Sequence, residues 1–532
     1  MRTHHTRRAV LGAAIAAAGT GVLAACSEST SSGGHGSMNH GSAGEAAPKG
    51  YVEPNGPEVL AAERKRGSGP VRKVKLTATA TQLDLGGGRT VKSWAFGDRL
   101  PGREVRVTAG DTLALTLANN LPQATSLHWH GLALRNDMDG VPHLTQNAIK
   151  AGASFDYRFT VPHPGTYWFH PHSGVQLDRG LYAPLIVDDP KEPLKYDKEW
   201  IVVLDDWLDG IDGATPDAVL AHLTHGRGGV HSAEDMASPT ATAEHMPSPT
   251  ATTEGPSMMM MGATSPQLGG DAGDIRYPLY LVNGRAASAP SSFSAKPGDR
   301  IRLRIINAAA ETAFRIALGD HELTVTHTDG FPVRHAKTDA LLLGMGERYD
   351  VLVTAGDGVF PLTAIAEGKR AVAMALLRTG GGAAPASSAR PKELSGRLLT
   401  ADRLRAAESV ALPARKPDRT IKLRLTGSMA QYNWAFDGKP YTHDQRHPVR
   451  AGERVRLVFT NGTRMWHPIH LHGHTYALAN VQNGPRKDTS IVLPNDTLTV
   501  DFDADNPGLW MLHCHNVYHS ESGMMTVLGY QK

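Results

Sequence analysis

The chain has 532 residues and a formal net charge of +3, so it is long enough for three or four domains and too weakly charged to suggest a nucleic-acid partner. Charged residues make up 20% and hydrophobic residues 40%, as in soluble globular proteins, while 56 glycines and 34 prolines favour turns and short strands over long helices. Two counts are unusual, 26 histidines and only two cysteines.

The first 25 residues have the features of an export signal. Arg7 and Arg8 lie in a basic leader, and residues 9–25 form an apolar stretch that is too short for a comfortable membrane span. The paired arginines resemble a twin-arginine signal, and the sequence Leu-Ala-Ala-Cys at 23–26 resembles a bacterial lipobox, whose cysteine receives lipid. We therefore predict an exported, extracytoplasmic protein that lipid on Cys26 attaches to the cell membrane. The alternative for Cys26 is a small residue near an ordinary cleavage site.

After a Ser-, Gly- and Ala-rich tether, placed at residues 26–67, the chain repeats one pattern three times. In residues 110–119, 298–307 and 452–461, a glycine and an acidic residue lead through an alternating strand to an asparagine nine positions after the glycine. This spacing indicates triplication of a whole domain, and short alternating strands with Gly and Pro turns predict β-sandwiches. The predicted boundaries are 68–190 for domain one, 191–380 for domain two and 418–532 for domain three, with a linker at 381–417.

Two segments interrupt this organisation. Residues 231–274, in domain two, are of low complexity: a stretch that begins at Met236 nearly recurs at Met246, and residues 258–261 are four consecutive methionines. We predict a disordered, Met-rich insertion there. The linker between domains two and three is rich in Ala and Arg, and we predict a short helix near residues 401–408.

Paired histidines occur in the first and third copies of the repeat. Residues 164–172 and 507–515 both begin with Pro-Gly and place His-x-His five positions after the glycine. A further pair follows each repeat strand, at 128–130 in domain one and 470–472 in domain three, whereas no such pair follows Asn307. We therefore predict that domains one and three carry metal ligands and that domain two is structural.

The run at 513–515, His-Cys-His, lies on a predicted strand, where neighbouring side chains point to opposite faces. If Cys26 carries lipid, Cys514 has no disulfide partner, which favours a metal-bound thiolate. A buried thiolate with two histidines and a distant methionine forms a blue copper electron-transfer site. The ligands that the chain offers for such a site are Cys514, His467, His519 and Met524.

The histidine pairs supply ligands for a second metal site, on the face of that strand opposite Cys514. Within a strand, histidines at positions i and i+2 point to the same side, so each pair presents two imidazoles to one site. Eight imidazoles exceed the needs of one metal ion and fit three coppers in a pocket that admits oxygen. The eight are His128, His130, His170, His172, His470, His472, His513 and His515.

Four segments resemble the four copper signatures of multicopper oxidases: H-W-H-G at 128–131, H-P-H-S at 170–173, H-P-I-H-L-H-G at 467–473 and H-C-H-N-V-Y-H-S-E-S-G-M at 513–524. The resemblance covers about residues 70–532. It implies an all-β fold of three cupredoxin-like Greek-key β-sandwich domains, and four copper ions: one type 1, one type 2 and a type 3 pair. The ligands it implies are His467, Cys514, His519 and Met524 for type 1; His128 and His470 for type 2; and His130, His170, His172, His472, His513 and His515 for the type 3 pair.

The exported, Met-rich, three-domain form resembles the bacterial copper-resistance oxidases. This implies that a one-electron donor, Cu(I) or else Fe(II), delivers electrons through His467 and Cys514, and that O2 is reduced to water. The insertion is then expected to capture Cu(I) through its thioethers, with a solvated linker as the alternative. We expect a monomer. The alternative functions are a laccase that acts on phenols, a copper-sequestering binding protein, and a non-catalytic scaffold, which would have lost ligands.

Asp139 lies nine positions after His130, in a loop where the family has an acidic residue that helps deliver protons to the oxygen site. We predict that catalytic role for Asp139, since dioxygen reduction consumes protons and proton relay needs a titratable group. The alternative is an ordinary turn residue before Gly140.

Residues near the type 1 ligands bear on the substrate. Met465 is predicted either to contact incoming Cu(I) or to pack in the core. Relatives specialised for Cu(I) often have an acidic residue near that position, whereas this chain has Thr463 and Arg464, which argues against a preformed substrate-copper site of that design. Glu521 is expected to guide a cationic substrate or to be a solvated loop carboxylate. Isolated histidines are expected to be ordinary surface or core residues; they are His143, His163, His327 and His474.

Overall fold

The computed structural model describes residues 49–225 and 263–532. The predicted signal, Cys26, the tether up to residue 48 and the insertion up to residue 262 lie outside these ranges. Strands predominate, and the α-helices found within the two ranges are α1 (Pro57–Arg66), α2 (Pro216–His225) and the short α3 (Val517–Glu521). No helix in the described parts of the chain is long and apolar enough to span a membrane.

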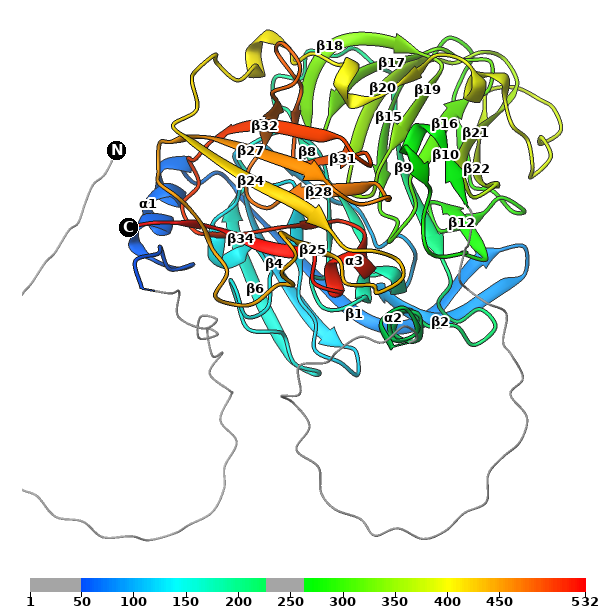
Figure 1. The fold of residues 1–532 in the computed structure, drawn as a ribbon. Helices are drawn as coiled ribbons and strands as arrows, with labels where there is room; N and C mark the ends of the chain where they lie inside the picture. The colour runs from blue at the N-terminus through cyan, green and yellow to red at the C-terminus, as the bar shows by residue number, and fades with distance from the viewer. Residues whose placement is uncertain (1–48, 226–262) are drawn as a thin grey trace, which may run out of the picture. The chain divides into compact units, whose positions relative to one another are not determined.

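The strands of residues 71–188 form two four-stranded sheets (Figure 1). One has the order β2-β1-β4-β6, with β1 (Val71–Gly86), β2 (Arg89–Phe96), β4 (Thr112–Asn120) and β6 (Ser154–Thr160). The other has the order β3-β8-β7-β5, with β3 (Val105–Thr108), β5 (His128–His130), β7 (Gly165–His170) and β8 (Ala183–Asp188). Both strands with His-x-His pairs, β5 and β7, are neighbours at one edge of this second sheet.

The next two sheets contain no paired histidines. The seven-stranded sheet β13-β12-β9-β15-β20-β17-β18 consists of β9 (Lys198–Trp207), β12 (Leu279–Val282), β13 (Arg285–Ala286), β15 (Arg300–Asn307), β17 (Leu323–Thr328), β18 (Phe331–Thr338) and β20 (Arg348–Thr354). The six-stranded sheet β14-β22-β21-β16-β19-β23 consists of β14 (Ser292–Ser294), β16 (Phe314–Leu318), β19 (Ala340–Leu343), β21 (Val359–Ala366), β22 (Ala371–Arg378) and β23 (Leu398–Leu399).

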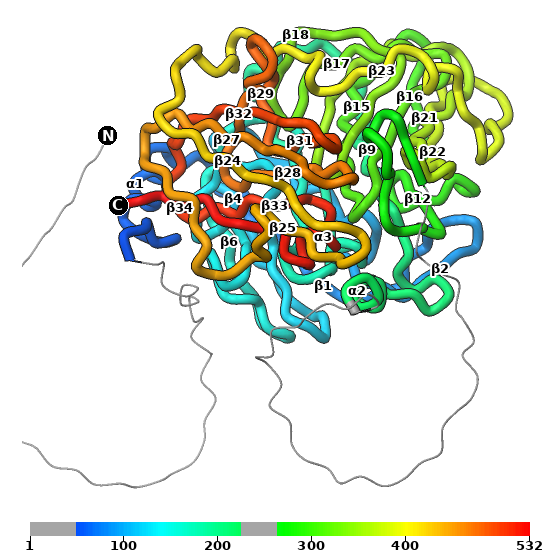
Figure 2. The backbone as a smooth tube through the Cα atoms, in the orientation of Figure 1, coloured from blue at the N-terminus to red at the C-terminus, as the bar shows by residue number. Residues whose placement is uncertain are grey.

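Of the last two sheets, only the second contains strands with the remaining histidine pairs. The sheet β25-β24-β27-β32-β29-β30 consists of β24 (Arg419–Thr426), β25 (Ala435–Phe436), β27 (Arg454–Asn461), β29 (Tyr476–Leu478), β30 (Arg486–Lys487) and β32 (Thr497–Asp503). The sheet β26-β34-β33-β28-β31 consists of β26 (His447–Val449), β28 (His467–Leu471), β31 (Thr489–Val492), β33 (Leu509–Cys514) and β34 (Met525–Tyr530). Figure 2 shows β28 and β33 side by side, as their antiparallel pairing requires.

The threefold sequence repeat corresponds to β4, β15 and β27. Each of these strands lies between a parallel neighbour and an antiparallel one. The asparagine at its end, Asn119, Asn307 or Asn461, is buried, and its side-chain amide donates to two backbone carbonyls. Its Oδ1 accepts a hydrogen bond from the backbone N–H two residues ahead. Such a turn fastens the following loop to the strand, which explains why asparagine ends all three copies.

The end of the predicted insertion is folded. Residues 263–274 form β10 (Thr264–Ser265), the 3-10 turn η3 (Pro266–Leu268) and β11 (Gly270–Asp271). Leu268 and Asp274 are 0% exposed, and Asp271 forms a β-bridge with Met465. The prediction of disorder was wrong for residues 263–274, because burial of this short segment depends on distant partners that its local composition does not show.

The predicted linker also differs from expectation. In place of one short helix near residues 401–408, it contains the 3-10 turns η4 (Lys392–Ser395), η5 (Ala401–Arg403) and η6 (Glu408–Val410). Within the same linker, β23 pairs with β19 and so extends a sheet of the middle domain. Part of the linker is therefore anchored by backbone hydrogen bonds.

Candidate metal centre

Three donor side chains meet behind β33. Cys514 ends that strand, His467 begins β28, and His519 lies in α3. The helix begins here because the side chain of Asn516 accepts hydrogen bonds from the backbone N–H groups of Tyr518 and His519. The Sγ of Cys514 lies 3.7 Å from His467 Nδ1 and 3.8 Å from His519 Nδ1, and the two nitrogens are 3.1 Å apart. One ion could contact all three atoms.

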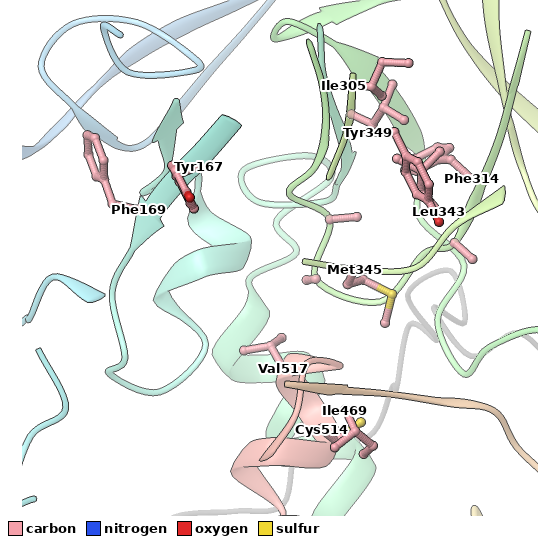
Figure 3. Packing of buried hydrophobic residues seen from close by; sticks show 14 of the residues in the cluster. Tyr167, Phe169, Ile305, Phe314, Leu343, Met345, Tyr349, Ile469, Cys514 and Val517 are labelled. Carbon is pink, nitrogen blue, oxygen red and sulfur yellow. The ribbon is translucent and has the colours of Figure 1, made fainter. Parts of the chain in front are cut away.

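Met524, the predicted fourth ligand, follows α3. Its backbone N–H donates to the His519 carbonyl, and its own carbonyl accepts from the Cys514 N–H, each at 3.0 Å, so the loop folds back on β33. The Met524 side chain is buried in the same apolar cluster as the thiol. Figure 3 shows Cys514 close to its cross-strand partner Ile469 and to Val517. Burial raises the pKa of Cys514, and a bound cation would offset this cost of forming the thiolate.

The outer nitrogens of the two imidazoles are also occupied. Nε2 of His467 lies 2.9 Å from the Thr463 hydroxyl, and Nε2 of His519 lies 3.1 Å from Asp274 Oδ2. These contacts fix the rings with Nδ1 toward Cys514, as second partners of metal-binding histidines do. Asp274 was missed in the sequence because it ends a segment predicted to be disordered.

The other eight predicted ligands form one cluster, on or directly after β5, β7, β28 and β33. His128 pairs with His170 across the first two strands, and His470 pairs with His513 across the other two. Their donor atoms fall into three groups, and within each group the atoms lie within 4.8 Å of one another. The groups are His128, His130 and His470; His130, His170 and His515; and His172, His472 and His513.

The chemistry of this donor set fits copper. Nδ1 of His128, His170 and His470 each lies 2.9 Å from a backbone carbonyl oxygen, so Nε2 is left for a ligand. Burial lowers the pKa of His472 and His513 well below the usual value, which keeps these imidazoles neutral and able to bind metal. Within the described residues, the buried ring nitrogens of this cluster without a hydrogen-bond partner are His128 Nε2, His130 Nδ1, His170 Nε2, His470 Nε2 and both nitrogens of His515.

Asp139 joins the two halves of the cluster. Its Oδ2 lies 2.9 Å from His472 Nδ1 and its Oδ1 lies 3.2 Å from His128 Nδ1, and the carboxylate is 0% exposed. The loop is held against domain three because the Asn136 side chain donates to the Leu509 carbonyl and accepts from the Leu509 N–H. The structure therefore brings the predicted Asp139 into contact with histidines of both domains.

Models of one protein family, described as multicopper oxidase, match residues 77–192, 239–382 and 414–532. The chain belongs to the multicopper oxidase family. It is therefore a copper-containing oxidoreductase that uses O2 as electron acceptor, and the predicted family is confirmed.

This multicopper oxidase is 47% identical to multicopper oxidase MmcO of Mycobacterium tuberculosis over 527 residues, which cover 99% of this chain and 96% of that protein. It is 28% identical to copper resistance protein A of Escherichia coli over 572 residues, covering 85% of this chain and 93% of the relative. The solved multicopper oxidase of Pseudomonas thermotolerans superposes with a TM-score of 0.63 at 25% identity, over 86% of this chain and 99% of that one. Fet3p, a multicopper oxidase that functions in iron import, has a TM-score of 0.68 at 21% identity, over 86% and 90%. The predicted fold of three cupredoxin-like domains is confirmed.

Domain two of this multicopper oxidase supports the histidine cluster from outside. Asp488 Oδ1 lies 3.1 Å from His130 Nε2, and Arg348 donates to both oxygens of Asp488 at 2.7 Å. Burial raises the pKa of Asp488, but the positive charge of Arg348 outweighs this effect and holds that pKa well below its usual range. Nothing in the sequence pattern singled out Asp488 or Arg348, because they are distant along the chain and belong to no His-x-His motif.

Proposed function

We propose that this oxidase couples the one-electron oxidation of Cu(I), with Fe(II) as a second donor, to the four-electron reduction of O2 to two waters, and that it acts in copper resistance. The observation that carries the choice of a metal cation is the carboxylate beside the proposed type 1 ligands. The carboxylate of Asp274 contacts the outer nitrogen of His519 at 3.1 Å. A carboxylate at this place attracts a cationic donor more strongly than a neutral phenol.

We further propose that four copper ions occupy the two clusters. The type 1 ion would be held by Cys514, His467, His519 and Met524; the type 2 ion by His128 and His470; and the type 3 pair by His130, His170, His172, His472, His513 and His515. When bound, the type 1 copper would supply one-electron chemistry and the other three would supply oxygen reduction.

The chain itself connects the two clusters through β33. The Cys514 thiol and the His513 and His515 rings lie on opposite faces of one strand, a few covalent bonds apart. The Cys514 carbonyl also accepts a hydrogen bond from His513 Nδ1 at 2.8 Å. This second connection holds the His513 ring against the backbone of Cys514.

The relatives support the proposed role. One is named copper resistance protein A, and a solved structure of the same fold is a multicopper oxidase that functions in iron import. For this chain we propose export by the twin-arginine signal and attachment to the membrane surface through lipid on Cys26, on the strength of the sequence at 7–26. We also propose that the chain is a monomer.

The substrate can be tested with variants that leave the copper ligands untouched. We expect deletion of residues 231–262, which spares β10 and β11, and the substitution Asp274→Asn each to lower kcat/KM for Cu(I) about tenfold, a loss of about 1.4 kcal/mol of cation stabilisation. Turnover of a phenol should be unchanged by the deletion and should fall less than Cu(I) turnover in Asp274→Asn, because Asp274 also holds the His519 ring. The turnover of each donor is measured as oxygen uptake in the presence of Cu(I), Fe(II) or a phenol.

Two outcomes would replace the proposal. If phenol turnover exceeds Cu(I) turnover in the wild-type protein, the enzyme is a laccase. If the copper-loaded protein consumes no oxygen with any donor, it is a copper-sequestering protein. The matched control is Asp137→Asn, since Asp137 pairs with Arg135 in a loop of domain one.

A further inference from the structure

One histidine of the eight-imidazole cluster differs from the rest in burial. His172 is partly exposed, whereas the other seven are buried. Two cavities meet at this residue, one of about 450 Å³ and one of about 20 Å³, and both are lined by His172, Gly174 and Glu521. The small cavity also borders His170, His513 and His515, so the larger one ends beside the cluster.

We call the larger cavity the loading groove; it is lined by His143, His172, Tyr441, Met511, Glu521 and Met525. Its lining includes thioethers, imidazoles and a carboxylate, which are ligands for copper ions. Met525 is partly buried in the groove, and His143 is exposed at the surface. The ligand types therefore extend from the surface to His172.

A second exposed imidazole stands beside His143. The rings of His143 and His443 have centroids 5.9 Å apart and planes at 67°, close to the 5.8 Å and 63° of His128 and His470 within the cluster. Tyr441, which lines the groove, packs edge-on against His443 at 5.6 Å. Neither the His143 ring nor the His443 ring has a hydrogen bond or ion pair within residues 49–225 and 263–532, so both can bind a ligand.

The backbone at His143 is also unusual. Its φ is +63°, a conformation that residues other than glycine adopt rarely and at a cost in free energy. The loop maintains it because the His143 N–H donates to the Gln146 carbonyl at 2.9 Å. The His143 ring comes from domain one and the His443 ring from domain three, so the pair spans the same two domains as the cluster.

We propose that His143 and His443 form a copper-loading site, at which an incoming copper ion binds before it passes Met525 and Glu521 to reach His172. The proposal rests on the proposed occupation of the cluster by copper. It gives His143 a function, where the sequence alone predicts an ordinary surface residue. The site is transient, since two imidazoles and a nearby thioether bind copper less firmly than a closed set of buried ligands.

The test is the rate of copper uptake by the full-length apoprotein. In the variant H143A/H443A, the near-ultraviolet absorption of the copper cluster should return at least about tenfold more slowly, the size of effect that loss of a supporting partner has on metal affinity. The final copper content and spectrum should equal those of the wild type. The blue absorption of the type 1 copper should return at the wild-type rate, because its ligands lie on the other face of β33. The control is His335→Ala, an exposed histidine outside the groove.

A second variant guards against misfolding. Met525→Leu keeps the side-chain volume and removes the thioether, so it should slow loading by Cu(I) more than loading by Cu(II). Direct binding is measured without O2, on the copper-loaded protein after its coppers have been reduced, by competition with a chelator for Cu(I). The wild type should hold one additional Cu(I), with an affinity that falls at least about tenfold in H143A/H443A.

Several results would overturn the proposal. Equal loading rates for wild type and H143A/H443A would do so, as would equal slowing of the blue and near-ultraviolet signals. If loading is normal but the loaded variant has a raised KM for O2, the groove is an oxygen path instead. If the wild-type protein never gains the cluster absorption, the proposed copper occupancy fails, and the chelator competition alone then decides whether His143 and His443 bind copper.

Discussion

Cys514 makes one contact through its thiol and one through its backbone, and only the first depends on the residue type. Its Sγ faces the imidazoles of His467 and His519, and its carbonyl accepts a hydrogen bond from His513. In Cys514→Ser the backbone contact stays while the thiolate is lost, and a hydroxyl does not form the blue copper site.

We expect Cys514→Ser to lose the blue absorption and oxygen consumption while the near-ultraviolet absorption of the other coppers remains. Visible and near-ultraviolet spectra of the copper-loaded variant measure this. Strong blue absorption in the variant would refute the type 1 assignment. The matched control is Cys26→Ser, which should keep the colour and move the protein from the membrane fraction to the soluble fraction.

Asp139 lies where a proton carrier could reach the histidine cluster, because its carboxylate contacts both His128 and His472. We propose that it delivers protons for oxygen reduction. Asp139→Asn keeps the size and one hydrogen-bonding oxygen but cannot carry the proton.

The expected result for Asp139→Asn is a fall in kcat of about 10²-fold or more, which is typical for loss of a general acid. Copper content and blue colour should be retained, and the solvent isotope effect on kcat should increase. A variant that instead binds fewer coppers would show that Asp139 only orients the two histidines. Asp137→Asn, two positions away, should leave kcat unchanged.

At the scale of elements, prediction from the sequence succeeded where the signal is local. The repeat strands β4, β15 and β27 follow from alternation and from the closing asparagine, and the histidine pairs follow from spacing along single strands. Asp274 and Asp488 were not predicted, because each contacts a histidine far away in the chain. The folded segment 263–274 was missed for the same reason, since its burial is tertiary.

The strands β15 and β20 carry a cluster of charged side chains that are far apart in the sequence and meet only in the folded protein. Asp350 accepts hydrogen bonds from Arg302 at 2.5 Å and from Arg304 at 3.1 Å, and Thr166 of β7 donates to it at 2.6 Å. All of these groups are buried. Burial raises the pKa of Asp350, but the positive charges of Arg302 and Arg304 outweigh this effect and hold that pKa well below its usual range.

Asp350→Asn should lower the free energy of unfolding by about 3 to 5 kcal/mol, because two buried guanidinium groups lose a shared counter-charge. The wild-type contribution is present above the unfolded pKa of about 3.9 and is lost as the pH falls, since the unfolded chain then binds the proton first. Urea unfolding at pH 6 and pH 3.5 should therefore show a smaller pH effect in the variant. An equal pH effect would refute this account. Asp98→Asn, at an exposed ion pair, is the control.

At the scale of the whole molecule, the two copper clusters differ in what they connect. The proposed type 1 ligands His467, Cys514 and His519 all belong to domain three, so an ion bound there would stabilise one domain. The other eight histidines come from strands of domains one and three, so ions bound there hold two domains together. Copper bound in this cluster would thus be part of the tertiary structure.

Copper loading should therefore raise the thermal unfolding midpoint by an amount that depends mainly on the interdomain cluster. An ion at 100 times its Kd adds about 2.7 kcal/mol, and each kcal/mol corresponds to about 2 to 4 °C for domains of this size, so we expect a rise of about 5 °C or more. Cys514→Ser should keep most of the rise, whereas His130→Ala should lose most of it. Calorimetry of the apo and loaded forms measures both. If Cys514→Ser loses the larger part, the type 1 site rather than the interdomain cluster provides the stabilisation, because only that site depends on the thiolate.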